Sequence, residues 1–262
     1  MQEKQLLSRQ EWVNACRPHA LSCSEVLEEI RKRVLQNGAV SIVLLDLDST
    51  LYEVGPRTYQ ILCEWKATVE INAFPKVKRA FQNLNPSKIG YSLKDTFQNM
   101  ELSLEDEEIY GALQVLKKYW EDRFFANQYL RYDRVYSGAV EFVKQLYMMG
   151  IYIVYLTGRD EPDMGEGTRQ NLLKHGFPFG VSKTDLLLKS SSNVPDLEHK
   201  QNAAEIVKNK GELIASFENE PANLVAIYDL FPQAMHVFVD TSCSEHPARP
   251  CNGLYLLKNF AA

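Results

Sequence analysis

The 262-residue sequence lacks long hydrophobic runs, since the longest, such as IYIVYL at 151–156, are far shorter than a membrane-spanning helix. Such a helix needs roughly 18 apolar residues or more. The first residues, MQEKQLLSRQEW, have neither a basic start nor a sustained apolar core, so they do not follow the pattern of a secretory signal. We therefore expect a protein that is not exported and that has no membrane partner.

Dense blocks of Lys and Arg are also absent, and the net charge is -5. Both features disfavour nucleic-acid phosphates or anionic lipid as the main partner. The cysteines are few, scattered and odd in number at five, which fits free thiols in a reducing, cytoplasmic compartment. Cys243, His246 and Cys251 lie close together, but a fourth ligand at finger-like spacing is missing, so a turn is favoured over a metal site.

What the sequence does contain is an alternation of apolar runs and helical segments. Strands are expected over 39–48, 151–157, 184–189, 212–218 and 234–240, and helices over 22–38, 168–176, 196–211 and 221–231. Continuously apolar strands suit a parallel sheet that is covered on both faces. The alternation predicts an α/β protein with a Rossmann-like three-layer core and a mostly parallel sheet. Ser24 is the expected N-cap of the first helix, and Gly38 its stop.

One region breaks this alternation. From about 56 to 134 the sequence shows helical periodicity, loops with Pro75 and Pro86, and no buried strand pattern. The clearest helix covers 104–125, with charged residues on one face and apolar residues on the other. We expect an α/β core made of 1–55 and 135–262, with an inserted all-helical domain at 56–134.

Two carboxylates, Asp46 and Asp48, follow the apolar run SIVLL. Open α/β sheets bind ligands beyond the carboxyl ends of their strands, and side chains two positions apart in a strand start on the same face. Two carboxylates this close repel each other, so the pair favours a divalent cation such as Mg²⁺ or another positive charge nearby. The alternative is that they are turn or helix-capping residues.

Further polar residues follow the other predicted strands. The second strand ends in Thr157, whose hydroxyl can bind a phosphoryl oxygen, and Gly158, which permits close backbone approach. A later strand ends at Glu218 and Glu220, which are candidate oxygen ligands for a metal, and Lys200 in the preceding helix adds positive charge. Because these features converge on one sheet edge, they favour one functional site.

These motifs resemble those of the haloacid dehalogenase-like (HAD) hydrolase superfamily, most of whose members are phosphatases. The family's Asp-x-Asp-x-Thr motif is matched by Asp46 to Thr50, and its strand-end Ser or Thr by Thr157. Its lysine is best matched by Lys200 and its acidic pair by Glu218 with Asn219. The resemblance covers roughly 38–54 and 137–241.

Two departures from the family pattern leave alternatives open. Glu stands where Asp is usual in the acidic pair, so either Glu218 or Glu220 is the metal ligand. The family's lysine is Lys200, with Lys183 and Lys189 as alternatives.

The resemblance implies a magnesium-dependent phosphatase acting on a small phosphorylated metabolite. Asp46 would attack phosphorus and form an aspartyl-phosphate, while Asp48 would protonate the leaving group. The resemblance also implies the ligand sets. Mg²⁺ would be held by Asp46, the backbone carbonyl of Asp48 and Glu218, and the phosphoryl group by Asp46, Thr157, Gly158, Arg159 and Lys200. The helical insertion matches the position of the family's cap domain.

Three other functions are weighed against this one. A phosphotransferase would use the same intermediate and pass the phosphoryl group to a sugar hydroxyl. A non-catalytic regulatory or binding module is disfavoured because a silenced site would have no use for both Asp46 and Asp48. The stretch TGRDE at 157–161 also resembles polynucleotide end-processing phosphatases, but the sequence has no basic stripe for nucleic acid.

Overall fold

The computed structural model describes residues 6–261, without the side chains of residues 196 and 197. The expectation that the chain has no secretory signal concerns in part residues 1–5, which lie outside the described residues. Within the described range the main feature is a seven-stranded sheet in the order β1-β9-β8-β7-β2-β5-β6, in which every neighbouring pair is parallel. Its strands are β1 (His19–Ala20), β2 (Ser41–Leu45), β5 (Tyr152–Asp160), β6 (Thr184–Lys189), β7 (Glu212–Glu218), β8 (Met235–Val239) and β9 (Tyr255–Leu257).

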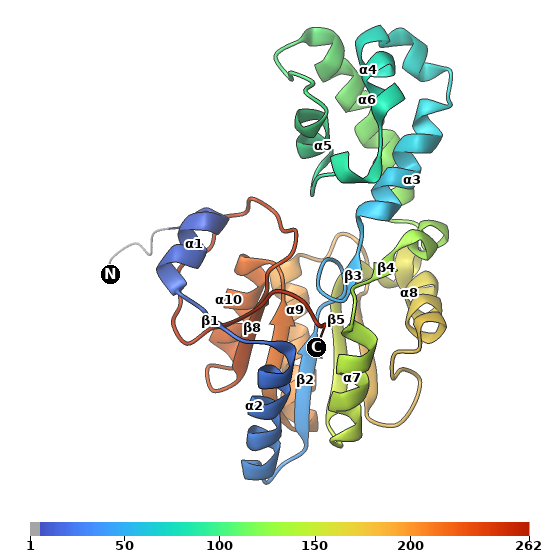
Figure 1. Cartoon of the computed structure of the whole chain (residues 1–262). Coiled ribbons are helices and arrows are strands. Elements are labelled where there is room, and N and C mark those ends of the chain that lie inside the picture. The colour runs from blue at the N-terminus through green and yellow to red at the C-terminus, as the bar shows by residue number, and fades with distance from the viewer. Residues whose placement is uncertain (1–5, 262) are drawn as a thin grey trace.

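Helices cover both faces of this sheet (Figure 1). The central strand β2 is buried along its whole length, and its side chains alternate between two hydrophobic clusters. Val43 and Leu45 pack with residues of α2 (Cys23–Gln36) and α7 (Ala139–Met148). Ile42 and Leu44 pack with residues of α9 (Asp196–Lys210) and α10 (Pro221–Leu230). Because β2 is continuously apolar, its side chains can pack against the helices on both faces of the sheet. The predicted α/β core with its parallel sheet is confirmed.

A helical unit is inserted between the short strands β3 (Tyr52–Glu53) and β4 (Arg134–Val135), which pair antiparallel. Figure 1 shows this unit standing beyond one end of the sheet. Its α-helices are α3 (Gly55–Lys66), α4 (Pro75–Ala80), α5 (Leu93–Asn99) and α6 (Glu107–Phe124). Short 3-10 segments join them, namely η1 (Glu70–Ala73), η2 (Phe81–Asn83), η3 (Pro86–Lys88) and η4 (Asn127–Tyr132). Trp65, Phe81 and Phe97 lie in a hydrophobic cluster formed within this unit, separate from the clusters around the sheet.

Several element boundaries differ from the sequence-based expectation. Helix α2 begins at Cys23, because Ser22 rather than Ser24 is its N-cap and forms a reciprocal capping box with Glu25. The helix ends at Gln36, before Gly38. Strand β2 covers only Ser41–Leu45 of the predicted 39–48, and the turn that follows lies at residues 49–51, after the two carboxylates. Local side-chain hydrogen bonds thus decided boundaries that the periodicity left open.

Helix α8 (Glu161–His175) begins well before the predicted residue 168. Asp160 caps it by accepting a hydrogen bond from the Asp163 amide at 2.8 Å. Two glycines in its first half conceal the helical pattern, and Gly167 serves close packing, because an added Cβ would lie 2.6 Å from the Asn127 carbonyl oxygen. Helix α1 (Arg9–Cys16), the edge strand β1 and its neighbour β9 were not predicted, and both strands are very short.

Candidate active site

A cavity lies where strands β2, β5 and β7 end, beneath the helical unit. Its volume is about 570 Å³. Because β2 lies between β5 and β7 in the sheet, the strand ends bring together residues far apart in the sequence. Of the predicted site residues, the cavity is lined by Asp46, Asp48, Thr157, Gly158, Arg159, Lys189, Glu218 and Glu220.

Asp46 lies in a crowded carboxylate environment. Burial raises the pKa of its carboxyl group well above the ordinary value, and the charge of Glu218 raises it further, while Lys200 acts in the opposite direction. The Lys200 ammonium donates a hydrogen bond to Glu218 Oε2 at 3.0 Å, and both side chains are buried. Lys200 already neutralises Glu218, so an ionised Asp46 adds a carboxylate charge that this pair does not balance.

This excess of negative charge bears on the expected metal. Among residues 6–261, no three His, Cys, Asp or Glu side chains converge as a ready-made metal cage. Mg²⁺, however, commonly binds one or two protein carboxylates and completes its shell with water and substrate oxygens. The oxygen donors of Asp46 and Glu218, whose mutual repulsion a cation would relieve, fit such an ion. Cys243, His246 and Cys251 do not form a metal cluster within the described part of the chain.

Glu220 is directed to different partners from Glu218. Its two carboxylate oxygens accept hydrogen bonds from the Ser244 amide at 2.7 Å and the Ser244 hydroxyl at 2.6 Å. The hydroxyl of Tyr91, from the helical unit, also hydrogen-bonds to Glu220, and burial together with that carboxylate raises the pKa of Tyr91. Glu218 instead accepts from Lys200 and, at 3.0 Å, from the Glu220 amide. Glu220 thus joins the helical unit to the 242–247 segment.

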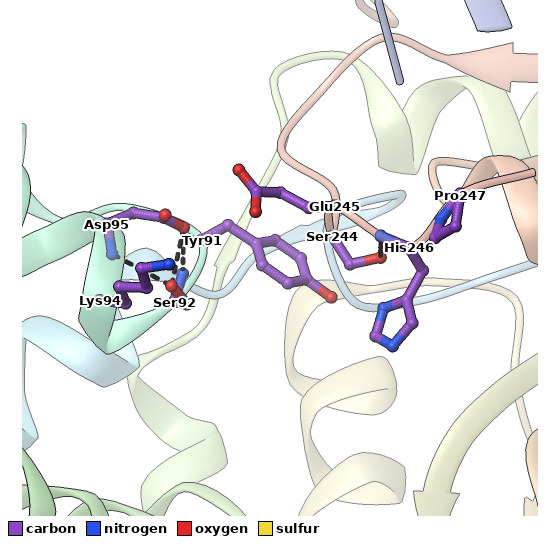
Figure 2. Close-up of a pocket in the computed structure, with 8 residues that line it drawn as sticks. All are labelled: Tyr91, Ser92, Lys94, Asp95, Ser244, Glu245, His246 and Pro247. Carbon is purple, nitrogen blue, oxygen red and sulfur yellow. Dashed lines mark hydrogen bonds between the residues drawn. The ribbon is translucent and has the colours of Figure 1, made fainter. Parts of the chain in front are cut away.

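Tyr91 also lines a second cavity of about 360 Å³ between the helical unit and the C-terminal segment. Figure 2 shows its ring reaching from the helical unit toward Ser244 and His246. On the other side of the ring, Ser92 and Asp95 form the capping box of helix α5, drawn as dashed lines in the figure. The second cavity is therefore a seam between the two parts of the molecule.

Asp48 lies in a contrasting environment, a buried network of two arginines and two aspartates. Arg159 Nε donates to both carboxylate oxygens of Asp48 at 3.2 Å, and Arg57 Nη2 donates to Asp48 Oδ1 at 3.3 Å. Both guanidiniums also bind Asp133, at 2.8 Å from Arg159 and 2.6 Å from Arg57. Burial acts to raise the pKa of Asp48, but the guanidiniums of Arg159 and Arg57 outweigh it and lower the pKa to about 2.

Two members of this network, Arg57 and Asp133, were missed by the sequence-based reasoning. They lie 76 positions apart in the chain, at the two ends of the helical unit, and neither belongs to a motif. Arg159 was predicted to bind phosphate, whereas its guanidinium here contacts Asp48, Asp133 and Thr168. Arg57 and Asp133 come together only because β3 and β4, which connect the helical unit to the core, pair with each other. A single sequence carries no local signal for this pairing.

The turn after β2 is held from the neighbouring strand ends. Ser49 has a left-handed backbone conformation with φ of 61°, which is uncommon for a residue with a side chain. The Thr50 hydroxyl donates to Asn219 Oδ1 at 3.0 Å, and Asn219 Nδ2 donates to the Ser242 carbonyl at 2.7 Å. The Thr241 hydroxyl also donates to the Ser49 carbonyl. These bonds fix the direction in which Asp46 and Asp48 leave the strand.

The three candidates for the family's lysine, Lys183, Lys189 and Lys200, lie at different places relative to the sheet edge that forms the cavity. Lys183 precedes β6 at the opposite end of the sheet, where its ammonium donates to the Gly150 carbonyl at 3.0 Å. Lys189 ends β6 and lines the cavity, and the Lys200 ammonium contacts Glu218. Thr157 is buried, and its hydroxyl accepts a hydrogen bond from the Arg159 amide at 3.3 Å.

None of the helices formed by residues 6–261 combines the length and the apolar character needed to cross a membrane.

Comparison with solved structures finds a similar fold in a proposed phosphatase from Clostridium difficile. It is 19% identical, with a TM-score of 0.51, over 84% of this chain and 94% of that chain. A haloacid dehalogenase-like family hydrolase from Streptococcus pneumoniae matches over 84% and 94% at 13% identity and a TM-score of 0.44. A HAD-superfamily hydrolase from Geobacter sulfurreducens matches over 86% and 95% at 11% identity and a TM-score of 0.47. No curated protein matches the chain.

A family model provides the stronger comparison, because it matches the sequence itself over residues 40–226. That range includes the two carboxylates after β2, the helical unit, Thr157, Lys200 and the acidic end of β7. The match covers well over half of the chain and agrees with the parallel sheet and with the positions of its strand ends. The chain belongs to the haloacid dehalogenase-like hydrolases.

Proposed function

We propose that the protein is a magnesium-dependent phosphatase that hydrolyses a small phosphomonoester through an aspartyl-phosphate on Asp46. The observation that carries this proposal is the contrast between two carboxylates of one turn. Asp46 faces Glu218 and Lys200, whereas Asp48 is held by Arg57 and Arg159. A nucleophile and a proton-transfer group need different surroundings, and the two environments supply them.

Asp46 is the nucleophile in this mechanism. Its carboxylate oxygen attacks the phosphorus, the bond to the alcohol oxygen breaks, and the phosphoryl group becomes bonded to Asp46. A bound Mg²⁺ supplies positive charge that offsets the charge on the phosphoryl oxygens and on the two carboxylates. Glu218 and Asp46 would hold that ion, together with the backbone carbonyl of Asp48. Lys200 keeps Glu218 oriented through its 3.0 Å hydrogen bond, and Thr157 and Gly158 position the phosphoryl group.

Asp48 moves the proton. With a pKa of about 2 it is an anion in the arrangement described above, so it can accept a proton from the water that hydrolyses the intermediate, but it is a weak base until its pKa rises. To protonate a leaving alkoxide it must first take up a proton from solvent water. A phosphate dianion bound beside it raises its pKa by like-charge repulsion and competes for the Arg159 guanidinium. Substrate binding therefore prepares Asp48 for the acid step.

The helical unit at 56–134 acts as a cap in this proposal. Its residues Tyr91, Trp120, Phe124 and Phe125 line the same cavity as Asp46. They exclude bulk water from the attacked phosphorus and shape the space left for the alcohol group.

The test measures phosphate release from an alkyl phosphate and from an activated aryl phosphate, with Mg²⁺ and with excess chelator. Hydrolysis is expected only with Mg²⁺. The Asp48→Asn variant is expected to lose roughly 10²–10⁴-fold on the alkyl phosphate and much less on the aryl phosphate, whose leaving group needs no proton. Equal activity in chelator would contradict the role of the metal. An equal loss on both substrates would show that another group donates the proton.

A further inference from the structure

Three aromatic residues form one side of the cavity, at the end of helix α6 that approaches the strand ends. We call Trp120, Phe124 and Phe125 the aromatic wall. The rings of Trp120 and Phe124 stack with centroids 4.2 Å apart, and Phe125 meets both edge-on, at 5.8 Å and 5.1 Å. All three line the cavity that contains Asp46 and Asp48.

Two members of the aromatic wall are fixed by other contacts. The Trp120 indole nitrogen donates to the Thr58 hydroxyl at 3.1 Å. Phe124 lies under the Arg57 guanidinium, whose carbon is 4.3 Å from the ring centroid, and its carbonyl accepts from Arg57 at 3.1 Å. These contacts hold the wall in place before a ligand arrives.

Phe125 differs in exposure, because 47% of it is exposed whereas Phe124 and Trp120 are partly buried. Its ring makes interplanar angles of 79° with Trp120 and 82° with Phe124, so neither neighbour stacks face to face on it. A large apolar side chain that is half exposed inside a charged cavity loses the benefit of burial unless a ligand covers it. The exposed ring thus offers a stacking platform in the same cavity as the phosphate-binding residues.

The charges around the cavity restrict what such a ligand carries. Carboxylates line it at Asp46, Asp48, Asp160, Glu218 and Glu220, against the cations Arg159 and Lys189. The Arg159 guanidinium is already bound by Asp48 and Asp133. A second anionic group on the ligand would meet more negative than positive charge.

We propose that the aromatic wall selects phosphomonoesters whose alcohol bears a planar aromatic ring without a negative charge, and that this ring stacks on Phe125. This inference rests on the proposed phosphatase function, because it needs the phosphoryl group at Asp46. A cavity of about 570 Å³ holds a phosphoryl group together with such a ring.

The test compares substrates with leaving groups of matched basicity. They are 2-phenylethyl phosphate, 2-cyclohexylethyl phosphate and the phenyl compound with a para-carboxylate. We expect kcat/KM for the phenyl compound to exceed that for the cyclohexyl compound by about three- to tenfold, the usual value of an aromatic contact. The para-carboxylate is expected to lower kcat/KM relative to the unsubstituted phenyl compound, and the decrease should be smaller at high salt. Equal values for phenyl and cyclohexyl would overturn the proposal.

Variants of Phe125 locate the effect. Phe125→Leu keeps an apolar side chain and is expected to abolish the preference for phenyl over cyclohexyl, whereas Phe125→Tyr keeps it. Tyr110→Leu serves as the matched control, since Tyr110 is 53% exposed on the same helix and does not line the cavity. A preference that survives in Phe125→Leu would show that the ring does not stack there.

A binding measurement separates this proposal from the proposed activity. Calorimetry with 3-phenylpropylphosphonate and 3-cyclohexylpropylphosphonate, in the presence of Mg²⁺, needs no hydrolysis. Tighter binding of the phenyl compound to wild type but not to Phe125→Leu supports the wall even if no phosphate ester is hydrolysed. If all three esters are hydrolysed without a kinetic or binding preference for the phenyl compounds, the phosphatase function is supported and the stacking on Phe125 is contradicted.

Discussion

Asp46 and Asp48 leave the same turn two positions apart, yet their surroundings are opposite in electrical balance. Around Asp46, the single ammonium of Lys200 already pairs with Glu218, so an ionised Asp46 carries an unbalanced charge. Around Asp48, two carboxylates and two guanidiniums neutralise each other within a buried cluster. The Asp48 network is thus complete with protein groups alone. The Asp46 site leaves a negative charge for a cation to balance, and this is the difference expected between a proton-transfer site and a metal-assisted nucleophile.

The largest effect is expected from Asp46→Asn. The amide lacks the charged oxygen that attacks phosphorus, so hydrolysis should fall at least about 10⁴-fold. Without metal the variant should nevertheless be more stable, because burial of a charged carboxylate and its repulsion with Glu218 are removed. Acid-quench trapping of the phosphoenzyme and thermal melts measure the two effects. A variant that still forms the phosphoenzyme would assign the nucleophile elsewhere.

Asp133→Asn tests the balanced network and should change stability in the other direction. It leaves two buried guanidiniums with one carboxylate, which typically costs about 3–5 kcal/mol of the free energy of unfolding. Glu161→Gln is the matched control, because it breaks the exposed pair with Arg169 and should cost less than about 1 kcal/mol. Denaturant titrations of the three proteins compare them. Similar losses for the two variants would mean that the buried network contributes no more than a surface pair.

The next effect separates Glu218, the last residue of β7, from Glu220. Glu218→Gln should raise the Mg²⁺ concentration for half-maximal activity by at least about tenfold, since even indirect metal contacts have effects of this size. Glu220→Gln should change it little, because Glu220 binds Ser244 and Tyr91. Magnesium titrations decide between them, with thermal melts as the check on folding. A larger shift in the Glu220 variant would reverse the metal assignment.

The smallest effect concerns acid stability. The pKa of Asp48 is about 2 in the folded protein, below its ordinary value of 3.8. The unfolded chain therefore binds more protons between these values, so the stabilisation is complete above about pH 4 and is lost as the pH falls toward 2. Its size should be about 1 kcal/mol, since 32% of the side chain is exposed. Urea midpoints of wild type and Asp48→Asn at pH 5 and pH 3 should converge at the lower pH. A constant gap would exclude this linkage.

The elements best predicted from the sequence are those with a strong local pattern. Strands β6 and β7 have the predicted bounds, because each is a compact apolar run that ends at charged residues. The N-cap of α2 was misplaced by two residues, since Ser22 and Ser24 are equally suitable by residue type. The Glu25 side chain accepts hydrogen bonds from the Ser22 amide and hydroxyl, and these bonds place the cap at Ser22. The start of α8 was missed because its glycines satisfy a tertiary contact rather than helix propensity.

The candidate site divides in the same way. Asp46 and Asp48 follow β2, while Thr157 and Glu218 lie in the last residues of β5 and β7. A parallel sheet gathers strand ends at one edge, so their proximity follows from the topology. Of the partners of Asp48, Arg159 lies on β5, but Arg57 and Asp133 do not follow from the sheet topology. Arg57 and Asp133 acquire their role only when the two linkers of the helical unit run side by side. Their contribution depends on a long-range pairing that local pattern cannot reveal.

The pairing of β3 with β4 also bears on how helical units could be exchanged between related enzymes. Because Glu53 lies opposite Arg134, the unit leaves and rejoins the core at neighbouring points, and a short turn could close the gap after its removal. Such a cut would discard Arg57 and Asp133 and leave Arg159 with Asp48 alone. A graft whose ends lie between Arg57 and Asp133 leaves both residues in the recipient and so preserves the charge balance. The segment that can be exchanged without disturbing this balance is therefore shorter than the inserted unit.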